Sequence, residues 1–131
     1  MAVKYPPIEL VKSIHANQIR QYGGIFGLRD PGLLESALAQ PRRSVGGKLI
    51  HKTIFDKAAA YGFHLCKNHP FVDGNKRVAF IIMYIFMANN NWIINASEES
   101  AYSMMMELAE GKLSKRRLSA WLQKNSHKSL K

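Results

Sequence analysis

An uninterrupted apolar run of eleven residues, Val78 to Ala88, constrains the fold of this chain more than any other feature. As an α-helix the run would be roughly 16 Å long, against the ~30 Å of a lipid bilayer core. It therefore predicts a helix that is buried on all sides within a small protein. The chain has 131 residues, enough for one compact domain whose other elements wrap around this helix.

Helix signals dominate the rest of the chain, because apolar side chains recur at helical spacing between residues that favour helix ends. We predict an all-α fold, a single-domain helical bundle over residues 1–131 around a central helix at about 74–90. The other predicted helices run from Pro7 to Gly23, from Asp30 to Pro41, from Thr53 to Lys67, from Ser97 to Glu110, and from Ser114 to Lys124.

The segments between these helices are short and more polar. From Arg42 to Lys52 the chain has two glycines, five basic residues and no helical period, which predicts an exposed basic loop or a short hairpin. Residues 92–94 form a short extended piece, and the polar end after Lys124 is expected to fray.

The charge of the chain narrows the choice of partners. Lys and Arg number 19 and Asp and Glu number 9, so the formal charge is +10. This favours nucleic acid, phosphorylated ligands, an acidic protein or a membrane surface, without choosing among them. A single cysteine, Cys66, excludes an internal disulfide and a Cys-based zinc cluster. The N-terminal residues lack the apolar stretch of a signal peptide, so we expect a soluble, cytoplasmic protein without a membrane partner.

The stretch that carries chemistry is His-Pro-Phe-Val-Asp-Gly-Asn-Lys-Arg at residues 69–77. Pro70 disfavours helical geometry at His69, so a helix ends there and a loop lets the histidine face the start of the next helix. Gly74 lets the backbone pass close to a ligand. The free N–H groups and the dipole of the new helix, around Gly74, Asn75 and Lys76, form an anion site. This stretch therefore holds a base and a phosphate cradle.

Three charged residues complete the set. Lys76 and Arg77 add two cations to the anion site, and Asp73 offers a carboxylate of the kind that Mg²⁺ prefers. Each feature alone is commonly just solvated surface, but adjacent cations at the positive end of a helix dipole are locally costly unless an anion binds there. Together these are the parts that phosphoryl or nucleotidyl transfer from a Mg-nucleotide requires.

The stretch resembles the signature loop of the Fic/Doc superfamily, specifically of its death-on-curing (Doc) toxins. The similarity extends over almost the whole chain, and it includes the helix stop at Tyr22, the helix that follows Asp30, the helix that follows Phe55 and the Ala109-Glu110-Gly111 element. The resemblance implies a Fic-like fold around the central helix.

The resemblance also implies roles by position. His69 would be the general base on a protein hydroxyl, Asp73 would hold Mg²⁺, and Gly74, Asn75, Lys76 and Arg77 would bind phosphates. Phe71 would be the structural anchor of the loop. Lysine at position 76, where AMP-transferring members have glycine, is similar to the Doc branch, which transfers the γ-phosphate of ATP.

The implied protein is therefore a toxin and a protein kinase that uses ATP and Mg²⁺. Its implied substrate is a Ser or Thr hydroxyl of a translation factor, elongation factor Tu in the resembled family, and the consequence is arrested translation. Glu110 has Met106 four residues before it instead of Ser or Thr, so we expect restraint by a separate antitoxin, Phd-like or other. Two alternatives stay open: transfer of AMP to a protein, and a non-enzymatic basic module that binds nucleic acid.

Residues outside the loop have simpler interpretations. We expect His15 to be a hydrogen-bonded core histidine and Cys66 to be a small buried side chain; His64 and Cys66 do not have metal-ligand spacing. Met104, Met105 and Met106 are expected to fill the core. The run 115–117 is a solvated face or a contact for an acidic antitoxin. The basic side chains Arg42, Arg43 and Lys48 belong either to a solvated loop or to a flap that orients the target, as in Fic-like proteins.

Overall fold

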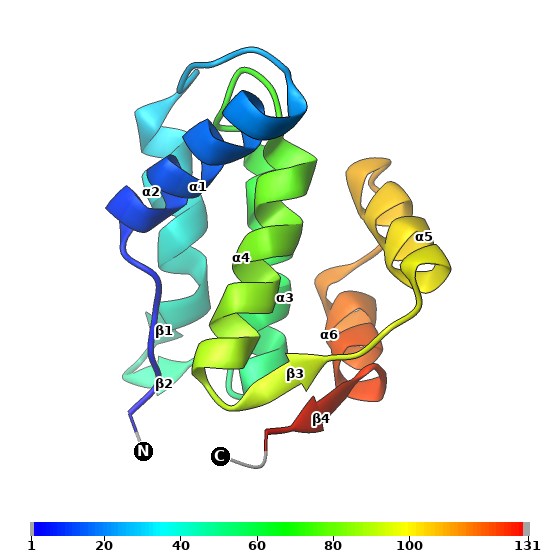
Figure 1. The fold of residues 1–131 in the computed structure, drawn as a ribbon. Helices are drawn as coiled ribbons and strands as arrows, with labels where there is room; N and C mark the ends of the chain where they lie inside the picture. The colour runs from blue at the N-terminus through cyan, green and yellow to red at the C-terminus, as the bar shows by residue number, and fades with distance from the viewer. Residues whose placement is uncertain (1, 130–131) are drawn as a thin grey trace.

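A computed structural model describes residues 2–129 and confirms the all-helical fold (Figure 1). The helices of the described chain are α1 (Ile8–Tyr22), α2 (Pro31–Ala39), α3 (Ile54–Asn68), α4 (Asn75–Asn89), α5 (Glu98–Ala109) and α6 (Lys115–Lys124). A 3₁₀ turn, η1 (Gln40–Arg42), follows α2, and four very short strands are β1 (Ser44–Val45), β2 (Lys48–Leu49), β3 (Trp92–Ile94) and β4 (Ser126–Lys128).

The helix starts follow from local capping chemistry. The Asp30 side chain accepts a hydrogen bond from the Leu33 N–H, and Pro31 occupies the first position of α2. Thr53 and Asp56 form a reciprocal capping box at the start of α3. These local signals account for the agreement between the predicted and observed starts of both helices.

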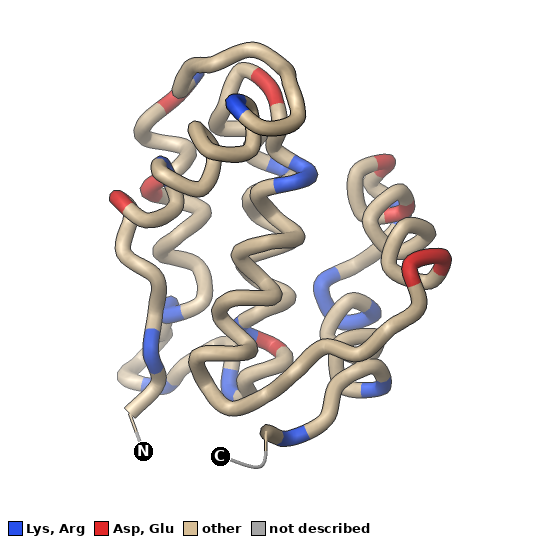
Figure 2. The backbone as a smooth tube through the Cα atoms, viewed as in Figure 1, with Lys and Arg blue, Asp and Glu red and all other residues tan. Residues whose placement is uncertain are grey.

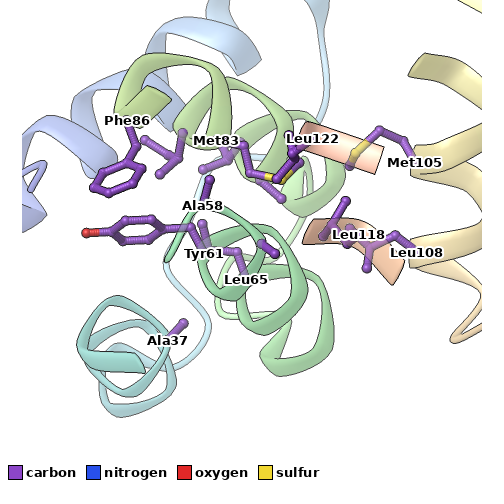
Figure 3. Packing of buried hydrophobic residues seen from close by; sticks show 14 of the residues in the cluster. Ala37, Ala58, Tyr61, Leu65, Met83, Phe86, Met105, Leu108, Leu118 and Leu122 are labelled. Carbon is purple, nitrogen blue, oxygen red and sulfur yellow. The ribbon is translucent and has the colours of Figure 1, made fainter. Parts of the chain in front are cut away.

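Helix α4 lies at the centre and packs along α3 (Figure 1). Gly62 of α3 permits the close approach, because an added Cβ there would collide with the Met83 side chain of α4. Figure 3 shows Tyr61 of α3 beside Phe86 of α4, at a centroid separation of 5.1 Å. On its other side α3 packs against α6, whose Leu118 and Leu122 are fully buried.

The prediction that α4 is buried on all sides is wrong for one face. Tyr84 is 41% exposed, and Phe80 and Ile81 are only half-buried. For Phe80 and Ile81 the reason is that α5 stands away from α4 and leaves an apolar groove of about 550 Å³ between them, which these two residues and Tyr102 help to line. The apolar run therefore serves both the core and a surface groove.

Two small antiparallel strand pairs, one a hairpin and one formed by distant segments, complete the described fold. The predicted basic loop contains the hairpin of β1 and β2, which turns at Gly46 and Gly47 with φ of +57° and +78°. The prediction of a frayed end after Lys124 is wrong for residues 126–128, because β4 pairs with β3. Further backbone bonds join Asn95 N–H to Asn125 and Ser129 N–H to Asn91. Residues 130 and 131, part of the same prediction, lie outside the described chain.

Among the described helices, none has the length and apolar character needed to cross a membrane.

A cluster of basic side chains joins α6 to α3 and to the segment before it. Lys115 Nζ lies 3.4 Å from His51 Nε2 and 3.1 Å from His64 Nε2. The pKa of His64 is lowered to about 4, chiefly by burial and then by the nearby positive charges of Lys115, His51, Lys67 and Arg43 in that order. The expectation of a solvated face at 115–117 is therefore wrong for Lys115, which is partly buried between two imidazole rings.

The lowered pKa of His64 predicts a loss of stability in mild acid. An unfolded histidine titrates near 6.5, so below that pH the unfolded chain binds a proton that the folded chain excludes until about pH 4. Between pH 6.5 and 4 we expect the free energy of unfolding to fall by about 1–3 kcal/mol. Urea denaturation at pH 7.5 and 4.5 measures this, and His64→Gln should remove most of the difference. His127→Gln, at an exposed position, is the control and should keep the pH dependence. An unchanged pH dependence in the His64→Gln protein would contradict the role of His64.

Candidate active site

The loop between α3 and α4, residues 69–74, begins where Pro70 stops α3. His69 is the C-cap residue of α3 and adopts a left-handed conformation with φ of +51°. Its carbonyl and that of Asn68 accept hydrogen bonds from the Arg29 guanidinium, at 2.9 Å from Nε and 2.9 Å from Nη2 respectively. Arg29 thus fixes the end of α3 and the backbone that carries the His69 side chain.

A segment between α1 and α2, residues 23–30, lies along this loop, and we call it the strap (Figure 1). The N–H groups of Arg29 and Asp30 both donate to the Pro70 carbonyl, at 2.8 and 3.0 Å. Val72 N–H donates to the Gly27 carbonyl at 3.0 Å. The loop therefore has a partner backbone on one side, which sequence reasoning did not predict.

The flap hypothesis for Arg42, Arg43 and Lys48 does not fit this arrangement. The hairpin β1–β2 directly precedes α3, whereas the loop follows α3, so the two lie at opposite ends of that helix (Figure 1). The chain segment that covers the loop is the strap. The basic hairpin is therefore solvated surface remote from the candidate site.

Phe71 fastens the loop to the core. Its side chain is 2% exposed and stacks on the His15 ring at a centroid distance of 3.9 Å. His15 Nε2 lies 2.7 Å from the Asp73 carbonyl, and since a carbonyl only accepts, this nitrogen donates the hydrogen bond. The expectation of a hydrogen-bonded core histidine is thus confirmed, and its partner is the loop itself.

Asn75 is the second clamp on the loop. Its side-chain amide donates to the Phe71 carbonyl and accepts from the Phe71 N–H, both at 2.9 Å, and the residue is 6% exposed. This side chain is therefore committed to the loop backbone. The phosphate-binding role predicted for Asn75 can fall only to its backbone N–H.

The start of α4 has the form of an anion site. Gly74 precedes the helix with φ of +80° and gives no side-chain cap, and the first intrahelical bond runs from Val78 N–H to the Gly74 carbonyl. The N–H groups of Asn75, Lys76 and Arg77 therefore have no acceptor within the helix. An added Cβ at Gly74 would lie 3.3 Å from Ile19 Cδ1, so the position suits glycine on both conformational and steric grounds.

Asp73 is held by two backbone donors. Its Oδ1 accepts from Gly74 N–H at 2.8 Å and its Oδ2 from Ile25 N–H of the strap at 3.1 Å. Gly24 permits this approach, because a Cβ added there would lie 2.8 Å from Asp73 Oδ2 and 2.8 Å from Ile19 Cδ1, at a φ of +124°.

Replacing Gly24 should therefore displace the carboxylate. Gly24→Ala adds a methyl group in a backbone conformation that alanine rarely adopts and forces either the strap or Asp73 to move. We expect a loss of about 1–3 kcal/mol in the free energy of unfolding and weaker binding of Mg-ATP, measured by urea denaturation and calorimetry. Gly46→Ala, which also has a positive φ but no atom within 4 Å, is the control for backbone strain alone. Equal Mg-ATP affinities in the two variants would contradict the steric argument.

The two predicted phosphate cations differ in their present contacts. Lys76 is exposed, and its Nζ lies 3.6 Å from Met106 Sδ. Arg77 Nη2 donates to the Gly23 carbonyl at 3.1 Å and Nη1 to the Gln18 carbonyl at 3.4 Å. Arg77 thus caps the end of α1 with two of its five N–H groups, which leaves donors for an anion. A role in holding α1 was not predicted for it.

A cavity of about 350 Å³ collects the predicted residues. His69, Asp73, Gly74, Lys76 and Arg77 all line it, together with Asn75, Cys66 and Ala109. Phe71 is not among these residues and belongs to the core. Burial raises the pKa of the Cys66 thiol to about 11, so this thiol is protonated at neutral pH and is not an activated nucleophile.

The donor set of the cavity fits a nucleotide-bound metal better than a protein-only metal site. The described residues contain no group of three or more His, Cys, Asp or Glu side chains that could hold an ion. Asp73 is a single carboxylate beside free N–H groups. Mg²⁺ is commonly bound by one or two carboxylates together with substrate phosphates and water, so Asp73 fits as the protein's ligand.

Comparisons with known proteins show the family of the chain. Residues 5–87 match the family model described as Fic/DOC family. The chain is 38% identical over 90 residues to "Toxin Doc" of Mycolicibacterium smegmatis, which covers 67% of this chain and 69% of that protein. It is 31% identical over 108 residues to "Protein kinase doc" of Escherichia phage P1, which covers 82% and 83%. Since the matched region contains both the strap and the loop, the chain belongs to the Fic/DOC family, in its Doc branch.

Proposed function

We propose that this protein is a Doc-type toxin of a toxin–antitoxin pair and acts as a protein kinase. It transfers the γ-phosphate of Mg-ATP to a Ser or Thr hydroxyl of a translation factor, with elongation factor Tu as the target that the family resemblance favours. The observation that carries the proposal is that His69, Asp73 and the unpaired N–H groups of α4 line one cavity. The names of the two relatives support the kinase and toxin assignments.

In this mechanism the side chains of the loop divide the work. His69 accepts the proton of the substrate hydroxyl. The hydroxyl oxygen forms the new bond to the γ-phosphorus, and the bond between the γ-phosphorus and the oxygen that joins it to the β-phosphate breaks. The N–H groups at the start of α4, with Lys76 and Arg77, stabilise negative charge on the phosphates. Asp73 would hold Mg²⁺, which would neutralise part of the phosphate charge. The Arg29 contacts keep the His69 backbone in place.

The choice between γ-phosphate and AMP transfer rests on Lys76. Its long side chain occupies the position at which AMP-transferring members have glycine, and Lys76 lines the same cavity as His69. A cation there favours a phosphate chain that enters in the reversed orientation. Transfer of AMP is the alternative, and the same site residues would serve it.

Labelled ATP separates the two reactions. The protein is incubated with bacterial extract and with ATP that carries the label at either the α- or the γ-phosphate. We expect protein-bound label from the γ position only, whereas label from the α position would overturn the kinase proposal. Lys76→Gly removes the long side chain beside the phosphates and should reduce γ-phosphate transfer by at least ~10-fold. If Lys76 sets the orientation of the phosphate chain, this variant should transfer AMP instead. Lys48→Gly, in the remote hairpin, is the control.

Restraint of the toxin is expected to come from a separate antitoxin chain. The apolar groove between α4 and α5 is the surface that we assign to it, because Tyr22 and Tyr102 are 71% and 68% exposed there. Lys76 and Arg77 line both this groove and the loop cavity. An amphipathic antitoxin helix in the groove, with one acidic side chain beside Lys76 and Arg77, would cover the phosphate site.

A further inference from the structure

Lys115 has surroundings that the proposed kinase chemistry does not use. It stands at the first position of α6, and its Nζ contacts the Nε2 atoms of His51 and His64 at 3.4 and 3.1 Å. None of these three residues lines the loop cavity. The residue is partly exposed, so reagents in solution can reach its amine.

The charges around Lys115 are positive and are not balanced by a carboxylate. The ion pairs of the described residues are Lys12 with Glu9 and Lys112 with Glu110, so Lys115 belongs to none of them. Figure 2 shows an unbroken basic stretch at the start of α6. The positive end of the α6 dipole adds to this repulsion.

Several groups face Lys115 from the elements packed against it. Burial, then Arg43 from the segment before β1 and Lys67 from α3, lower the pKa of Lys115. One carboxylate, Asp56 of α3, acts electrostatically on His51 of this cluster, and it accepts hydrogen bonds from Ser119 Oγ at 2.6 Å and from Thr53 N–H. Asp56 is thus occupied with capping and with α6. At neutral pH a larger share of Lys115 than of an ordinary lysine is therefore the free amine.

We propose that Lys115 is a site of N-acylation by acyl phosphates. The amine forms a bond to the acyl carbonyl carbon, the bond from that carbon to the phosphate oxygen breaks, and inorganic phosphate leaves. The proton of the attacking nitrogen passes to Nε2 of His64, which is neutral and within hydrogen-bonding distance. Arg43 and Lys67 attract the anionic reagent and stabilise the departing phosphate.

Acylation has a structural consequence at the α3–α6 contact. The product amide has one N–H where the ammonium had three, so it can donate to only one of the two imidazole rings. It also removes one positive charge from the cluster. Protonation of His64 then meets less repulsion, so the histidine pKa rises in the acylated protein.

The test is incubation of the whole folded protein with acetyl phosphate at pH 7.5, followed by peptide mass spectrometry of each lysine. Lys124 on the same helix and Lys112 before it serve as internal controls. We expect Lys115 to be acetylated on the order of 3–10-fold faster than Lys124. A Lys115 rate equal to or below that of Lys124 would overturn the proposal.

Two variants test the two parts of the proposal, proton transfer to His64 and attraction of the reagent by Arg43. Circular dichroism checks that each variant is folded. His64→Gln should slow acetylation of Lys115 several-fold and leave Lys124 unchanged; an unchanged Lys115 rate would refute proton transfer to His64. Arg43→Gln should slow the reaction with acetyl phosphate more than the reaction with uncharged N-hydroxysuccinimidyl acetate. Equal slowing with both reagents would refute the role of Arg43 in attracting the phosphate.

Discussion

His69→Ala should reduce phosphate transfer to the target by about 10²–10⁴-fold, because it removes the positioned base. The fold should survive, since Arg29 contacts the backbone carbonyl of His69, which alanine keeps, and the backbone bonds of the strap are made by Pro70 and Val72. Binding of Mg-ATP should also be nearly unchanged. Transfer of γ-labelled phosphate measures the rate, calorimetry measures Mg-ATP affinity, and growth after induction gives the effect in cells.

The controls for this variant address conformation and location. His69→Asn retains a side chain that tolerates the left-handed backbone at φ of +51° but has no basic nitrogen, so it should be as inactive as alanine. His127→Ala, on exposed β4, should be fully active. Full toxicity of the His69→Ala protein would refute the catalytic assignment, and the growth defect would then have to come from binding.

Phe71→Ala should give the largest loss of stability among the loop variants, about 3–5 kcal/mol in the free energy of unfolding. The ring is 2% exposed and stacks on His15, so its removal leaves a cavity beneath the loop and frees the histidine that holds the Asp73 carbonyl. Urea denaturation measures the loss. We also expect weaker Mg-ATP binding under conditions in which the variant is still folded.

Phe26 of the strap offers a matched control. It is the same residue type, close in the fold to the same loop, but is 57% exposed. Phe26→Ala should change stability by less than about 0.5 kcal/mol. If the two alanine variants were equally stable, Phe71 would not be the anchor of the loop.

The features that could be predicted from sequence are those encoded within a few residues. Thr53 and Asp56 specify the start of α3 by a reciprocal cap, and Pro70 specifies its end. Because Gly74 and the helix that follows are also adjacent in sequence, the layout of the loop follows from local rules. The positions of His69, Asp73 and Lys76 around one cavity follow in turn from that layout.

The features that were missed depend on contacts between distant residues. The Arg29 contact to His69 spans 40 positions and the hydrogen bond from Ile25 to Asp73 spans 48, so no local sequence pattern predicts either of them. The pairing of β4 with β3 uses backbone groups, which carry no composition signal. The polarity of residues 126–128 was therefore misinterpreted as fraying.

The surroundings of Lys115 also depend on contacts between distant residues, so they could not be predicted from the sequence. Its three-residue basic run at 115–117 is typical of a solvated face. Only the fold brings His51 and His64 to the Lys115 amine and so distinguishes it from its neighbours.

The central claim, that the loop and the start of α4 bind Mg-ATP, is tested most directly by titrating Mg-ATP into ¹⁵N-labelled protein and following the amide signals by NMR. We predict the largest shifts at Asn75, Lys76 and Arg77, whose N–H groups have no acceptor within α4, and little change at Lys115 and Arg116. Shifts concentrated at Lys115 and Arg116, with the amides of the loop unmoved, would contradict the account and would favour binding of polyanions by the basic surface.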